Sequence, residues 1–95
     1  MDVELLLRAI DHFGAEKQIM KAIEEMAELT TELARFRNNR GMAINILEEL
    51  ADVSIMVEQM CLIFGKELVE NHIAIKQRRL RLMIDTPDED EPKVG

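Results

Sequence analysis

The segment from about Met42 to Phe64 is apolar on almost every side, and it constrains the fold more than any other part of the 95-residue chain. A helix that is apolar all round has to be buried by its neighbours. Its main polar residues nevertheless project onto one strip about 100° wide on a helix of 3.6 residues per turn. These residues are Asn45, Glu48, Glu49, Asp52 and Gln59. An acidic strip on such a helix costs free energy unless it serves a purpose.

Three further segments have helical periodicity, which predicts an all-α fold. The expected helices run over residues 2–13, 15–37, 42–64 and 67–84. Gly14, the turn cluster at residues 38–41 and Gly65 separate them, and connections this short make consecutive helices antiparallel. We therefore expect an antiparallel four-helix bundle-like protomer over residues 1–85. A flexible acidic tail is expected over residues 86–95, because this stretch is polar and bounded by prolines.

Length and charge limit the classes of function. A 95-residue domain has difficulty covering its own apolar surface, so oligomerisation is expected. A net charge of -7 argues against nonspecific binding to nucleic acid or to an anionic membrane. The lone Cys61, the lack of a basic signal-peptide start and the lack of a run of about 20 apolar residues predict a cytoplasmic protein.

Two acidic clusters of the same design lie on consecutive expected helices, at residues 24–28 and 48–52. A spacing of three residues puts Glu25 beside Glu28, and Glu49 beside Asp52. If the two faces meet, each pair of charges about 5 Å apart repels by roughly 3 kcal/mol at an effective dielectric near 20. A bound cation would neutralise them. Oxygen ligands without His or Cys favour Mg²⁺, Mn²⁺ or Ca²⁺ over zinc.

A basic ridge runs along the last expected helix, where His72, Lys76 and Arg79 are spaced by four and three residues between two apolar stripes. This ridge could face the acidic strip or an anionic ligand. The alternative is that Lys76 and Arg79 pair with nearby Asp or Glu side chains.

Other interpretations of the acidic clusters stay open at this level. Either cluster alone could be a solvated helix face. The strip could also serve a non-catalytic oligomeric module that binds the basic surface of a partner. A carboxylate-bound iron oxidase is disfavoured because no Glu-x-x-His pair is present, and the chain has no P-loop motif.

The spacing of the acidic residues resembles the signature of the MazG-like branch of the all-α nucleoside triphosphate pyrophosphohydrolases. Glu24-Glu25-x-x-Glu28 is followed after twenty residues by Glu49-x-x-Asp52. The flanking stretches are similar too, at residues 13–14, 18–19, 22–29 and 46–53. The resemblance covers roughly residues 12 to 83.

This resemblance implies cleavage of a nucleoside triphosphate into a monophosphate and pyrophosphate, by attack of a metal-activated water at the α-phosphorus. The cofactor would be Mg²⁺, with Mn²⁺ as a substitute, and the role would be nucleotide-pool housecleaning. The implied metal ligands are Glu25, Glu28, Glu49 and Asp52. Glu24 and Glu25 would be the catalytic residues, with Glu24 supporting the metal ligands or assisting the attacking water. Lys76 and Arg79 would bind the phosphates. A homodimer or homotetramer is also implied.

Overall fold

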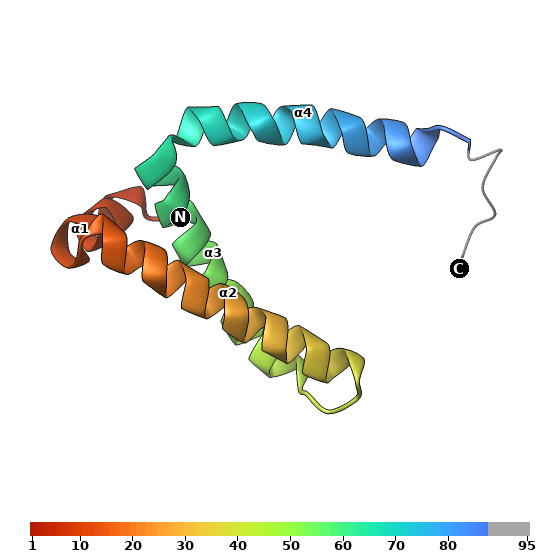
Figure 1. The fold of residues 1–95 in the computed structure, drawn as a ribbon, viewed down its shortest axis with the longest axis horizontal. Coiled ribbons are helices and arrows are strands. Elements are labelled where there is room, and N and C mark those ends of the chain that lie inside the picture. Colours follow the sequence, from red (N-terminus) through yellow and green to blue (C-terminus); the bar gives the residue numbers. More distant parts are fainter. Residues whose placement is uncertain (88–95) are drawn as a thin grey trace. The chain divides into compact units, whose positions relative to one another are not determined.

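The computed structural model of the protein describes residues 1–87, and this part of the chain contains four α-helices and no strand (Figure 1). The helices are α1 (Val3–Phe13), α2 (Ala15–Arg37), α3 (Ala43–Phe64) and α4 (Lys66–Asp85). Each bound lies within one residue of the periodic segments, so the all-α prediction is confirmed. The expected acidic tail falls mostly on residues 88–95, outside the described residues.

The first unit of the structure, residues 1–64, is a helical hairpin of α2 and α3 with α1 packed against both helices. In Figure 1, α2 and α3 run side by side in opposite directions. The buried apolar side chains come one from each helix: Leu6, Ala22 and Met56. The core of this unit therefore lies where the three helices meet.

The ends of these helices follow from local sequence. Asp2 caps α1, because its carboxylate accepts a hydrogen bond from the backbone N–H of Leu5 at 3.1 Å. Gly14 separates α1 from α2 with a φ of 93°, a conformation that glycine adopts without strain. Asn39 takes a φ of 60° in the turn between α2 and α3, where Asn is tolerated.

A buried pair of amides joins α2 to α3. The Nε2 of Gln18 donates a hydrogen bond to the Oε1 of Gln59 at 2.6 Å, and the Nε2 of Gln59 donates to the sulfur of Met56 at 3.7 Å. Gln18 is 7% exposed and Gln59 is 3% exposed. Because a buried amide without a partner is costly, this pair favours one alignment of the two helices.

The prediction that α3 is buried is not met within the single chain. Within the single chain only Met56 and Gln59 of this helix are buried. Its large exposed apolar side chains are Ile44, Leu47, Leu50, Ile55, Val57 and Phe64. The reason is geometric, because α1 and α2 are its neighbours in this unit and two helices cannot cover every side of a third.

The second unit begins at Gly65, and its helix α4 contains no buried residue. Gly65 adopts a φ of 124° and precedes the first residue of the helix. Large apolar side chains on α4, among them Leu68, Ile73, Leu80 and Ile84, are exposed. A helix of this length gains little stability from intrinsic propensity alone, so its apolar stripes are surface available for packing.

We expect Gln59→Leu to lower the free energy of unfolding by about 1–3 kcal/mol, because it leaves the buried amide of Gln18 without a partner. The double variant Gln18→Leu/Gln59→Leu should recover much of this loss, since it removes both amides. Urea denaturation of the four proteins in this cycle measures both effects. Additive losses in the double variant would contradict the coupling.

Candidate metal centre

Three carboxylates from two helices meet in the middle of the α2–α3 hairpin. Glu25 comes from α2, and Glu49 and Asp52 come from adjacent turns of α3. One carboxylate oxygen of each residue lies within 4.8 Å of the corresponding oxygens of the other two. A cation placed among them would be within reach of all three.

Glu25 is buried and Glu49 is half-buried, which distinguishes this cluster from a fully solvated acidic face, although Asp52 is exposed. The side chain of Glu25 is 8% exposed, and its Oε1 forms an ion pair with the Nζ of Lys21 at 3.0 Å. The Oε2 of Glu25 and the Oε2 of Glu49 are buried and have no hydrogen-bond partner within residues 1–87. Buried polar atoms are normally satisfied, so these two carboxylate oxygens are acceptors that a cation could satisfy.

The electrostatics of the cluster reflect mutual repulsion. Burial raises the pKa of Glu49 above its ordinary value of 4.5, and the negative charges of Glu28, Glu25 and Asp52 raise it further. The hydrogen bond and charge of Glu25 raise the pKa of Lys21, with smaller contributions from other acidic residues. Lys21 therefore offsets part of the charge of the cluster from its outer side.

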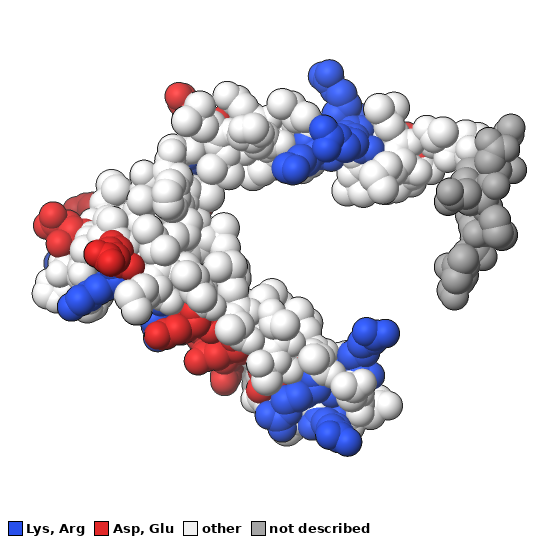
Figure 2. Space-filling model, viewed as in Figure 1, with Lys and Arg blue, Asp and Glu red and all other residues white. Residues whose placement is uncertain are grey.

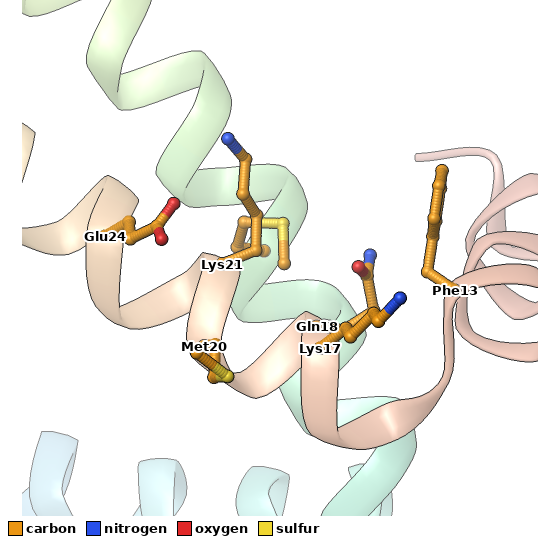
Figure 3. A pocket seen from close by; sticks show the side chains of 7 residues that line it. Phe13, Lys17, Gln18, Met20, Lys21 and Glu24 are labelled. Carbon is orange, nitrogen blue, oxygen red and sulfur yellow. The ribbon is translucent and has the colours of Figure 1, made fainter.

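Glu28, the fourth expected ligand, is exposed on α2 and interacts with Glu49, whose pKa it raises by its charge and by a side-chain hydrogen bond. Glu24 is exposed too, and it lines a cavity beside the cluster together with Lys21 (Figure 3). The structure thus brings Glu25, Glu49 and Asp52 together, and Glu28 lies close enough for its charge to raise the pKa of Glu49.

Lys76 and Arg79, the expected phosphate ligands, lie on α4 in the second unit. Both are exposed, and their spacing of three residues places them on one side of the helix. Figure 2 shows Lys and Arg side chains gathered over the middle of α4 and, in the first unit, Asp and Glu side chains gathered over the middle of α2.

Glu32 was not among the predicted site residues, yet its Oε2 is buried without a hydrogen-bond partner in the described residues. Its Oε1 lies 3.5 Å from Arg35 Nη1. The sequence did contain a signal for this residue, because Glu32 lies one helical turn beyond Glu28 and therefore on the same side of the helix. The antiparallel alignment that pairs Gln18 with Gln59 puts Glu25 opposite Asp52, Glu28 opposite Glu49 and Glu32 opposite Asn45. The polar strip of α3 therefore faces a matching strip on α2.

The chemistry of the donors fits a hard divalent cation. All three clustered residues offer carboxylate oxygen, and the set contains no thiolate or imidazole. Mg²⁺ is commonly held by one or two protein carboxylates together with phosphate oxygens of a substrate. The cluster can therefore hold Mg²⁺ and still leave the ion able to bind a phosphate.

Comparison of the chain with protein-family models, with curated proteins and with solved structures gave no match. Among the helices of residues 1–87, none combines the length and the apolar character that crossing a membrane requires.

We expect the metal-free protein to lose stability as the pH rises from about 4.5 through the raised pKa of Glu49. In this window the folded chain binds more protons than the unfolded chain, so the free energy of unfolding falls with rising pH. Glu49→Gln removes the titrating group and should raise the thermal midpoint at pH 7 by several degrees. Thermal unfolding in EDTA, monitored by circular dichroism, measures this midpoint.

Glu48→Gln is the matched control, because Glu48 is the exposed neighbour on the same helix and its substitution removes the same charge. It should keep the pH dependence of the wild type. A lower midpoint for Glu49→Gln than for Glu48→Gln at pH 7 would show that the Glu49 carboxylate stabilises the metal-free fold, contrary to this account.

Proposed function

We propose that the protein is a Mg²⁺-dependent nucleoside triphosphate pyrophosphohydrolase, which cleaves the substrate into a monophosphate and pyrophosphate. The observation that carries this proposal is the meeting of Glu25, Glu49 and Asp52, with unpartnered buried oxygens on two of them. The resemblance of the acidic spacing to the MazG-like family supports the reaction class, since those residues are the ones that the motif assigns to the metal.

In this proposal Glu25, Glu49 and Asp52 hold Mg²⁺, with Glu28 completing the set through its position beside Glu49. Mn²⁺ would serve as a substitute, because it accepts the same oxygen ligands. The bound ion supplies positive charge to the triphosphate and acts as a Lewis acid.

The remaining chemistry belongs to the side chains of the protein. Attack at the α-phosphorus requires a water that is oriented and partly deprotonated, which a nearby carboxylate can provide. Glu24 precedes the ligand Glu25 and is exposed, so it can approach a water or substrate at the edge of the cluster. We assign it the role of orienting the water and accepting its proton.

Lys76 and Arg79 would bind the phosphates in the assembled enzyme. Their positive charges would stabilise the negative charge that develops on the pyrophosphate leaving group. The apolar side chains that α3 and α4 expose would be covered in a bundle-like homodimer or homotetramer, in which these helices pack on neighbouring ones. Such an enzyme would act in the cytoplasm on free nucleotides, as in nucleotide-pool housecleaning.

We expect Glu49→Gln and Asp52→Asn each to lower hydrolysis of nucleoside triphosphates by at least about 100-fold, because each removes a metal ligand. Phosphorus NMR with Mg²⁺ and a panel of nucleoside triphosphates identifies the products. Pyrophosphate and monophosphate should appear in the wild type and in Glu48→Gln, and should disappear in EDTA.

Three results would contradict the proposal. Release of orthophosphate and a diphosphate would place the cleavage at the other anhydride bond. Equal rates for the wild type and both ligand variants would exclude this metal centre. No turnover with either Mg²⁺ or Mn²⁺ across the panel would favour a non-catalytic oligomeric module whose acidic strip binds a partner.

We also expect Lys76→Ala and Arg79→Ala to lower kcat/KM about 10- to 100-fold, which corresponds to about 1.5–3 kcal/mol for a hydrogen bond to a charged group. Arg81→Ala is the control, since Arg81 is exposed on another side of the same helix. Steady-state kinetics at saturating Mg²⁺ measure the change. Equal effects of all three variants would indicate a loss of general positive charge instead of specific phosphate contacts.

A further inference from the structure

A cavity of about 440 Å³ lies in the first unit where the end of α1 meets the first half of α2, and Met56 of α3 contributes to its wall. Figure 3 shows Phe13 at one end of this cavity and side chains from successive turns of α2 along it. The volume falls within the range of sites that hold small organic ligands. Nothing in the metal centre uses the apolar part of this space.

We propose that this cavity binds the nucleoside part of the nucleotide whose phosphates reach the carboxylate cluster. The inference rests on the proposed function, and it adds the place where the base and sugar are held. Its first support is proximity, because two residues that line the cavity adjoin the carboxylate cluster. Lys21 lines the cavity and pairs with Glu25 at 3.0 Å, and Glu24 lines it and directly precedes Glu25.

The apolar lining suits the face of a nucleobase. Phe13 offers an aromatic ring, and Met20 and Met56 offer flexible thioethers that adapt to a flat ligand. Stacking on one aromatic ring accepts any base, because every base has a π-face. The chain contains no Trp or Tyr, so Phe13 is the aromatic side chain that this cavity can use.

A buried amide gives the cavity a polar contact of fixed direction. Gln18 lines the wall of the cavity, and its Nε2 donates a hydrogen bond to the Oε1 of Gln59 at 2.6 Å. The Nε2 of Gln59 in turn donates to the sulfur of Met56, so the two amides cannot exchange their donor and acceptor roles without losing that bond. The Oε1 of Gln18 is therefore left as an acceptor for an N–H group on the edge of a base.

The charges along the cavity favour a nucleotide over an uncharged apolar ligand. Lys17 and Lys21 are four residues apart on α2 and lie on one side of the helix. Lys21 is committed to Glu25, whereas Lys17 lies farther along the cavity, toward the N-terminus of α2. An anionic ligand entering between Phe13 and Glu24 would meet both amines before its phosphates reach the cluster.

The test uses the methionine methyl groups of the full-length protein as reporters. Selective ¹³C labelling gives separate signals for the seven methionines, of which Met20 and Met56 line the cavity and Met42 and Met83 do not. We expect titration with the four nucleoside 5′-monophosphates, with and without Mg²⁺, to shift the Met20 and Met56 signals. Inorganic triphosphate, which has no nucleoside, should leave these two signals in place.

A matched pair of variants locates the binding. Phe13→Ala should raise the Kd of the monophosphates about tenfold through loss of stacking. Phe36→Ala should leave the Kd unchanged, because Phe36 has similar exposure, 50% against 54%, but lies at the other end of α2. Both side chains are exposed, so neither substitution removes part of the core.

Each contrary outcome has a distinct meaning. Unmoved Met20 and Met56 signals with every monophosphate, or an unchanged Kd in Phe13→Ala, would overturn the nucleoside site. Shifts that follow protein concentration instead of nucleotide would overturn it in favour of a second copy of the chain covering the cavity. Hydrolysis without shifts at Met20 and Met56 rejects this site alone, whereas shifts without hydrolysis reject the proposed reaction and retain the site.

Discussion

The confinement of Glu25 between α2 and α3, opposite Glu49 and Asp52, is the constraint on which the rest of the structure depends. A carboxylate that is 8% exposed and faces two others cannot be explained by solubility, since an exposed face would serve that purpose at lower cost. Lys21 compensates one oxygen of Glu25 from the outside. A bound cation would balance the remaining negative charge of Glu25, Glu49 and the exposed Asp52, and this is the basis of the metal site and the reaction proposed for it.

The apolar surface of the protein poses a related problem. The structure buries few apolar side chains in the first unit and none on α4. Exposed Leu, Ile, Val and Met side chains on α3 and α4 are far more numerous than the three apolar residues of the core. Assembly with further copies, as proposed above, would cover such surface and so add to the stability of the chain.

The sequence predicted secondary structure well and tertiary burial poorly, for a physical reason. Helical periodicity and the glycines at positions 14 and 65 are local signals, and they placed every helix to within one residue. The acidic strip of α3 was also found from periodicity, because side-chain direction on a helix follows from position alone. The burial of α3 within the single chain was overestimated. An apolar pattern on every side indicates that a helix needs packing partners, but it does not indicate whether the same chain supplies them.

The candidate site was predictable only where its signal was local. Two spacings of three residues gave Glu25, Glu28, Glu49 and Asp52 as neighbours within each helix, and the meeting of the two helices then followed from the short connection. The cavity beside Phe13 was not predictable, because it depends on the angle at which α1 packs against the hairpin. The pairing of Gln18 with Gln59 was missed for a similar reason, as it joins residues that are 41 positions apart.

The two glutamines that align the hairpin carry no charge. They lie seven residues from Glu25 and Asp52 respectively, about 10 Å along each helix, so this contact between the helices does not itself titrate. In the proposed metal site, the amide pair would therefore keep the three carboxylates close together after a cation leaves. If Mg²⁺ binds there as proposed, rebinding would need little rearrangement of the hairpin, and its rate would depend on how quickly the ion sheds its water.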